Sequence, residues 1–352
     1  MKTLFKITLF AILSIALNIQ AKAEIKTKKV SKTYSASTYL KIDTRYSRVE
    51  FKTWDKNEIK FDIAISAEGK KADKIQTMLD NINIDMTEGD DLIIVKTVFG
   101  DFFTFKKLSN SIFNKGKVKI SYTVYLPAKT QLDLVQKNST IFIANHTGNI
   151  KLDLSSCEFT AENLSGENDF QLRSSSFLKI REINEMNIDA GGSEINIEEA
   201  NSVTGESRDS KYKLGTINKL NIKSSRDNFE IKEIESLYGS SSMSKFDISY
   251  LGNEIDYDIN LGHLFVFNVD YMFNFIKLDS KLGNLGLSFS SKSNFNYEIN
   301  HRAVKFDKTS DFDLESDKTM DGKTVISKGK FGSKEAISEV NIRANNCKLK
   351  LE

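Results

Sequence analysis

A pair of apolar residues separated by one polar residue recurs at a nearly fixed interval through the second half of this 352-residue chain. From Ile197 through Leu214 and Ile231 to Ile248, each step is 17 residues. One such unit cannot bury its apolar face alone, so the repeat predicts units stacked on one another. The fold class we expect is all-β, a single-stranded parallel β-helix (β-solenoid). The inward pairs are Leu178/Ile180, Ile195/Ile197, Tyr212/Leu214, Phe229/Ile231 and Phe246/Ile248.

Small and hydroxylated residues recur between the apolar strands, for example in residues 174–176, 191–193 and 240–242. Such residues suit tight turns and bond to nearby backbone groups. Beyond Ile248 the interval widens to about 18 to 21 residues. We therefore expect repeats over residues 129–306, with the turns forming a column along one edge.

Residues 24–128 lack this interval but alternate between apolar and polar residues, as in residues 59–65 and 118–126. Ala72, Ile75, Met78 and Leu79 have helical spacing. A hairpin over residues 82–95 follows. The pattern predicts a β-rich N-terminal cap with one short amphipathic helix.

Residues 307–352 begin with a polar, acidic segment that fits a loop or an irregular hairpin. Two short alternating strands follow, at residues 340–342 and 349–351. We expect these strands to close the open end of the stack, because an exposed sheet edge invites pairing with another chain.

Residues 1–23 have the composition of a secretory signal peptide. Lys2 and Lys6 give a positive start, and Ala21 and Ala23 form a small-x-small cleavage site. The uncharged stretch between Lys6 and Lys22 is about 15 residues, whereas a membrane-spanning helix needs about 20. We expect export to the periplasm, the outer membrane or the cell surface.

Charge and cysteine content narrow the class of protein further. Without the leader, the chain has 47 basic and 48 acidic residues, so it lacks the basic footprint of a nucleic-acid-binding protein. Cys157 and Cys347 lie about nine repeats apart, roughly 40 Å in a β-solenoid. A disulfide needs Cα atoms within about 7 Å, so we expect two separate buried thiols.

Four motifs carry a resemblance to a known family. They are Leu40-Lys41-Ile42-Asp43, Tyr46-Ser47-Arg48-Val49-Glu50-Phe51, Trp54-Asp55-Lys56-Asn57-Glu58-Ile59 and Val124-Tyr125-Leu126-Pro127. The chain resembles the exported putative-adhesin β-solenoid proteins of the Bacteroidetes, a domain family of unknown function. The resemblance implies an envelope location and a β-solenoid fold, and it brings no catalytic residues. Here Ser, Arg and Asp often replace the glycines that the family has at its turns.

No catalytic or metal-binding residue and no cofactor is assigned from the sequence. His146, His263 and His301 lack a second ligand at zinc spacing and are expected in turns or on the surface. A carbohydrate-active enzyme would need paired carboxylates, which Asp209 with Asp227, or Asp247 with its neighbours, could offer on adjacent coils. The regular outward positions of these acids fit a solvated face better.

The acidic tract at residues 311–317 offers oxygen ligands for Ca²⁺ but lacks the glycine of an EF-hand loop. A solvated loop is the simpler interpretation of this tract.

Two aromatic clusters are the candidate binding residues. In the first, Leu264 and Val266 take inward positions, so Phe265 and Phe267 should face outward, where exposed apolar patches mark contacts with partners, ligands or membranes. The alternative is that the cap or the acidic loop covers them. The candidates of this cluster are Phe265, Phe267, Tyr271, Phe273 and Phe275, and those of the second cluster, between cap strands, are Phe102, Phe103 and Phe105.

These observations favour a non-enzymatic, adhesin-like envelope protein that binds a partner, a surface polymer or a membrane through its solenoid faces. Two alternatives remain: a polysaccharide lyase or glycosidase with a β-helix fold, and a purely structural envelope protein.

Overall fold

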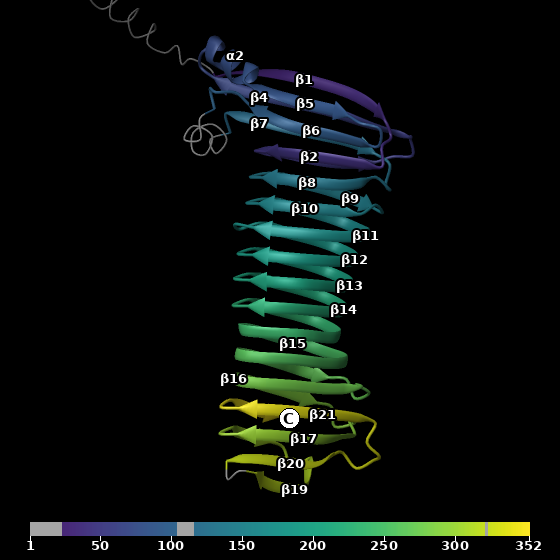
Figure 1. Ribbon diagram of the computed structural model, residues 1–352, viewed down its shortest axis with the longest axis vertical. Coiled ribbons are helices and arrows are strands. Elements are labelled where there is room, and N and C mark those ends of the chain that lie inside the picture. Colours follow the sequence, from purple (N-terminus) through teal and green to yellow (C-terminus); the bar gives the residue numbers. More distant parts are fainter. Residues whose placement is uncertain (1–22, 104–115, 321–322) are drawn as a thin grey trace, which may run out of the picture.

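The computed structural model describes residues 23–103, 116–320 and 323–352. Their 22 strands join in one sheet, and most neighbouring strands are parallel. The strands lie one above another along the long axis of the molecule, with one helix, α2, at the end that holds the N-terminal strands (Figure 1). The all-β class predicted from the sequence is confirmed.

The 17-residue interval appears in the structure as the step between paired strands. Leu178 pairs with Ile195, Ile195 with Tyr212, and Tyr212 with Phe229. We call each chain segment that lies on the previous one in this way a rung. The strands of the regular part are β10 (Ile150–Ser155), β11 (Glu158–Arg173), β12 (Phe177–Gly191), β13 (Glu194–Arg208), β14 (Lys211–Ser225), β15 (Asn228–Val269) and β16 (Phe275–Phe289).

Inside the stack, inward side chains at equivalent positions of successive rungs lie on one another and form the columns of the core. The rings of Tyr212 and Phe229 are stacked at 4.4 Å between centroids, and those of Phe229 and Phe246 at 4.3 Å. All three side chains are almost fully buried. Such aromatic pairs contribute about 0.5–1.5 kcal/mol each beyond the burial of their area. Stacking contacts between successive rungs therefore help to hold this part together.

The first rung comes from residues expected to belong to a separate cap. Leu40 pairs in parallel with Leu132, and Val49 with Ile141, across 92 residues of sequence. The sequence interval missed this rung because a long insertion separates it from the next one. The strands involved are β2 (Tyr39–Arg45), β3 (Ser47–Thr53), β8 (Gln131–Lys137) and β9 (Thr140–His146).

The cap consists of the insertion and the first strand of the chain. As predicted, α2 (Ala72–Asp80) is amphipathic, with Ile75 and Leu79 buried, and an antiparallel hairpin follows it. The cap strands are β1 (Glu24–Ser35), β4 (Glu58–Gly69), β5 (Ile82–Glu88), β6 (Leu92–Phe99) and β7 (Val118–Leu126).

The C-terminal strands do not close the stack as expected. Val340 in β21 (Ser338–Asn345) pairs in parallel with Ile276 of β16 on one side and with Tyr297 of β17 (Phe295–Arg302) on the other. Figure 1 shows β21, in yellow, between these two strands. The alternating pattern predicted the strand correctly, but it carries no information about which strands are its neighbours.

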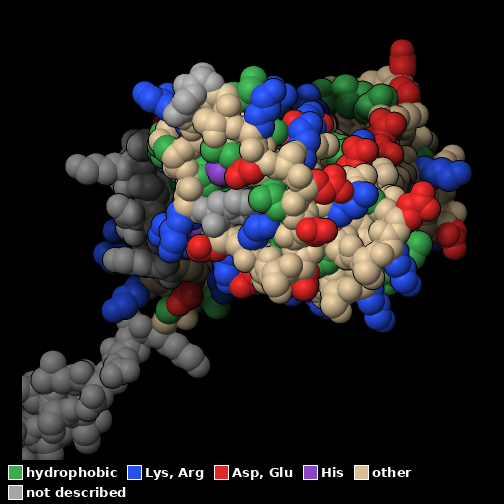
Figure 2. Space-filling view, turned by 90° about the horizontal axis from the view of Figure 1, so that it is seen from below, with side chains coloured by type: hydrophobic (Ala, Val, Ile, Leu, Met, Phe, Trp, Pro, Cys, Tyr) green, Lys and Arg blue, Asp and Glu red, His purple; other side chains and the backbone are tan. Residues whose placement is uncertain are grey.

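The far end is closed by the acidic segment instead. Its strands β19 (Phe312–Met320) and β20 (Thr324–Phe331) form an antiparallel hairpin, and β20 pairs with β17. The hairpin alternative for this segment was therefore correct. Seen from this end, Asp, Glu, Lys and Arg side chains are mixed over the surface (Figure 2), so the edge is blunted by charge. The remaining strands are β18 (Lys305–Lys308) and β22 (Lys348–Leu351), which pair in parallel.

Among the described residues, no helix combines the length and the apolar character needed to cross a bilayer.

Candidate functional site

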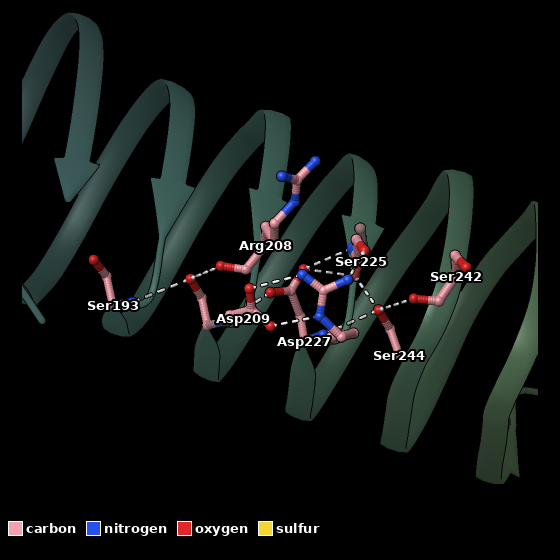
Figure 3. Close-up of polar contacts among 10 residues, drawn as sticks. Ser193, Arg208, Asp209, Ser225, Asp227, Ser242 and Ser244 are labelled. Atoms are coloured by element: carbon pink, nitrogen blue, oxygen red, sulfur yellow. Dashed lines mark hydrogen bonds and ion pairs between the residues drawn. The ribbon is translucent and has the colours of Figure 1, made fainter. Parts of the chain in front are cut away.

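A chain of buried polar groups follows the turn edge of the stack (Figure 3). The backbone N–H of Ser193 donates to Oγ of Ser210 (3.2 Å), and the N–H of Ser210 donates to Oδ1 of Asp227 (2.7 Å). The N–H of Asp227 in turn donates to Oγ of Ser244 (3.1 Å). Each side chain thus satisfies a backbone donor of the previous rung, which a buried turn requires. Serines at 17-residue spacing were the sequence signal for this column.

Asp227 is the one carboxylate in this column, and it is 2% exposed. Its Oδ2 also accepts hydrogen bonds from Oγ of Ser224 (2.7 Å) and from the N–H of Ser225 (3.1 Å). Burial raises the pKa of the Asp227 carboxyl, and the bonds to Ser210, Ser224 and Ser225 oppose that rise. This geometry gives Asp227 a structural role in the turns.

Asp209 lies in a turn of the same edge, but its side chain is exposed and has a different partner. Nε of Arg226 donates to its Oδ1 (2.7 Å) and Nη2 to its Oδ2 (2.9 Å). The guanidinium of Arg226 lowers the pKa of the Asp209 carboxyl. One carboxylate of the Asp209–Asp227 pair is therefore buried and the other is held at the surface by arginine, so they do not share a space for a substrate.

The histidines and cysteines do not gather. His146 is 1% exposed, and its Nε2 bonds to the carbonyl oxygen of Thr130 (2.7 Å). The expectation of a turn or surface histidine was wrong at this position, and burial lowers the pKa of His146 to about 4. Cys157 and Cys347 are free and buried, as predicted. In the described parts of the chain, no three His, Cys, Asp or Glu residues are grouped to hold a metal ion.

The outward aromatic residues differ in how exposed they are. Phe267 is 60% exposed and Tyr271 44%. Phe265 is half-buried because its ring stacks on His263 (4.5 Å between centroids) and lies across Gly286, where a Cβ would come within 2.9 Å of it. His263 is fixed in turn by a hydrogen bond between Nε2 and Oδ1 of Asp247 (3.1 Å).

Two other members of this cluster, Phe275 and Phe273, are less exposed. Phe275 is half-buried at the start of β16. Phe273 is 1% exposed and packs against Phe289 and Phe295 in the core. Phe273 therefore has no surface to offer a ligand.

The second aromatic cluster is only partly described. Phe103 is 5% exposed, and its ring contacts those of Phe99 (5.6 Å) and Phe102 (5.3 Å). Phe102 is partly buried against the core. Phe105 lies outside the described residues. What is described of this cluster is packing within the cap.

A groove of about 820 Å³ runs along the outer face of the rungs, from Lys179 on β12 to Phe267 on β15. We call it the Phe267 groove. Gly215 lies in its wall, and a Cβ there would come within 2.1 Å of the carbonyl oxygen of Glu198. The rest of the lining is mainly polar and charged, with three apolar residues: Asn196, Ile197, Glu198, Glu199, Lys213, Leu214, Thr216, Glu230, Ile231, Lys232, Asp247 and Ser249. The sequence indicated the outward aromatic residue but not the groove that leads to it.

A second groove, of about 770 Å³, lies beside the turn edge. We call it the serine groove, and its lining includes Arg208, Lys223, Ser225, Ser242 and Lys281. Nζ of Lys223 lies 3.4 Å from Oε1 of Glu206. This lining is charged and polar, and it contains no aromatic side chain.

No protein-family model and no curated protein matches this chain. Among solved structures, a "putative adhesin" from Parabacteroides distasonis is 10% identical, with 77% of this chain and 98% of that chain covered at a TM-score of 0.39. A "putative adhesin" from Parabacteroides merdae is 13% identical, with 75% and 96% covered at 0.37. A "putative lipid binding protein" from Parabacteroides distasonis is 13% identical, with 75% and 96% covered at 0.32.

Two of these three neighbours are named putative adhesins and come from the Bacteroidetes, the group to which the sequence resemblance also pointed.

Proposed function

We propose that this chain is a non-enzymatic β-solenoid protein of the bacterial cell envelope that binds an extended glycan in the Phe267 groove. The observation that carries the proposal is the exposed ring of Phe267 at one end of a polar groove that crosses successive rungs. The leader-like residues 1–23 support export of the chain.

The groove has the dimensions and lining that a linear polymer requires. Rungs spaced about 4.8 Å apart extend it over roughly 24 Å from β12 to Phe267. Hydrogen-bonding side chains return at every rung along this length, which suits a chain of repeated hydroxyl-bearing units. An exposed aromatic ring supplies a flat apolar surface for the face of one sugar ring, as binding sites combine apolar area with a few placed polar groups.

Catalysis on the same polymer is the second candidate, and the geometry gives it less support. A glycosidase needs two carboxyl groups facing one bond. Four acids line the groove, namely Glu198, Glu199, Glu230 and Asp247. Asp247 is bonded to His263, and Asp209 and Asp227 lie outside the groove lining and are engaged separately.

The test is binding of the chain without residues 1–23 to a panel of bacterial surface glycans. Phe267→Ser should lower the affinity for the glycan that binds by about tenfold, or about 1.4 kcal/mol. Tyr271→Ser is the matched control, because Tyr271 is an exposed aromatic residue outside the groove lining. Unchanged binding by Phe267→Ser, or an equal loss in both variants, contradicts the proposal. Shortening of the bound glycan during incubation would favour the enzyme instead.

A further inference from the structure

A column of residues in the left-handed backbone conformation recurs in successive turns along the turn edge. Asp209, Arg226, Met243, Leu261 and Leu282 have φ between 55° and 59°. The residues that directly follow Met243, Leu261 and Leu282 lie against one another on successive rungs. A Cβ on Gly262 would lie 2.0 Å from the carbonyl oxygen of Ser244, and Gly262 pairs with Gly283. These side chains therefore follow one another along the edge.

The residues of this column are charged before Met243 and apolar from Met243 to Leu282. Asp209 and Arg226 neutralise each other. Met243, Leu261 and Leu282, on the next three rungs, are 46%, 39% and 56% exposed. Large apolar residues are disfavoured in this backbone region, where Asn, Asp and Gly are common. Their side chains gain little burial in return. We call these three residues the apolar ridge.

Basic side chains border the apolar ridge on both sides. Lys281 directly precedes Leu282, and Lys245 follows Met243 by two residues. On the next two rungs, Lys348 and Arg302 hold equivalent positions beside the same edge. All four are exposed, and none forms an ion pair with another described residue.

Two acids of the same rungs share the serine groove with Lys281. Asp258 and Asp279 are on the strands that lead into these turns, and they line the serine groove. The edge itself thus carries exposed apolar groups with unpaired positive charge around them.

We infer that the apolar ridge is a peripheral membrane contact for an anionic phospholipid surface. Met243, Leu261 and Leu282 enter the boundary between headgroups and acyl chains, while Lys245, Lys281, Arg302 and Lys348 bind the lipid phosphates. Apolar side chains combined with surrounding lysines and arginines are the combination that anionic bilayers bind. The Phe267 groove is lined by other residues and takes no part in this contact.

The ridge offers an unusually clean test, because asparagine accepts the left-handed conformation and already stands at Asn138 and Asn346 in equivalent turns. The variant Met243→Asn/Leu261→Asn/Leu282→Asn removes the three apolar side chains, and asparagine adopts the left-handed backbone conformation at these positions more readily than Met or Leu does. The control variant Asp209→Asn/Arg226→Asn changes the same column above the ridge.

The measurement is co-sedimentation of the chain without residues 1–23 with vesicles of phosphatidylglycerol and phosphatidylcholine, and with vesicles of phosphatidylcholine alone. The unaltered chain should bind the anionic vesicles, and 0.5 M salt should weaken that binding because charges are then screened within about 4 Å. The ridge variant should lose at least about tenfold in vesicle affinity, and the control should bind as the unaltered chain does. Glycan binding should be unchanged in the ridge variant.

Three results would overturn the inference. The unaltered chain fails to bind anionic vesicles, the ridge variant binds them as well as the unaltered chain does, or the unaltered chain forms a dimer that the ridge variant does not. The last result would assign the ridge to contact with a second copy of the chain.

Discussion

Tyr257 donates its hydroxyl to the carbonyl oxygen of Ile222, 35 residues earlier, at 3.2 Å. This bond passes over Gly239, which pairs directly with Ile222. A Cβ on Gly239 would come within 2.2 Å of the same carbonyl oxygen, and its φ is 122°. A missing side chain on one rung thus makes room for a large side chain on the next, and burial raises the pKa of Tyr257 well above its usual value.

Replacing this glycine should therefore be costly. We expect Gly239→Ala to lower the free energy of unfolding by about 3 kcal/mol, since it combines a steric clash with a disfavoured backbone conformation. Gly191→Ala is the control, because the nearest atoms to a Cβ there lie 3.9 Å away. Urea denaturation of both variants checks this, and equal stabilities would contradict it.

Stability should fall in acid because of His146. Its neutral ring donates Nε2–H to Thr130, and its pKa is about 4 in the fold against about 6.5 unfolded. A lowered pKa gives stability that is present above pH 6.5 and is lost as the pH falls through 4. The shift corresponds to about 3 kcal/mol. His146→Gln should show a smaller loss between pH 7 and pH 4 in urea denaturation, and parallel pH profiles would refute this assignment.

Asp227 should act in the opposite direction. A raised carboxyl pKa favours the fold at low pH, and that contribution is lost as the pH rises through the folded-state pKa. We expect the unfolding free energy of the unaltered chain, compared with that of Asp227→Ser, to decrease as the pH rises from 3 toward 7. Serine is the residue at the equivalent positions 193, 210 and 244, so the backbone should tolerate it. A difference that does not depend on pH would show that Asp227 titrates normally.

Removing one whole rung should be tolerated. Deleting residues 194–210 joins Ser193 to Lys211, the residue that pairs with Glu194. The rungs above and below then meet in register, so the shortened chain should still unfold cooperatively. Deleting only residues 194–201 removes about half a rung, so the residues that follow lose their register and inward side chains come to lie outside. This shorter deletion should abolish cooperative thermal unfolding, measured by circular dichroism. The prediction fails if both deletions behave alike.

The sequence predicts the rungs that directly follow one another in the chain, but not the pairings between distant segments. Rungs from Leu178 to Leu287 follow one another without interruption, so the interval revealed both their strands and their inward residues. The pairing of Leu40 with Leu132, and of Val340 with Tyr297, depends on neighbours that are far apart in the chain. No interval records such a pairing.

The candidate sites show the same limit. Alternation placed Phe267 outside correctly, but the burial of Phe273 depends on Phe289 of β16 and Phe295 of β17. The apolar ridge escaped notice because Met243, Leu261 and Leu282 look like ordinary apolar residues until their backbone conformation is known.

The position of β21 has a consequence for how the molecule assembles. A stack that grew in the order of the chain would set β17 directly on β16, and β21 would then have no place. The gap must stay open, or open again, until residues 338–351 arrive and pair on both sides. During that delay two unsatisfied edges face the surroundings, which is the stage at which aggregation competes with folding. Pairing of this single segment is thus a late step that completes the stack from β16 onward.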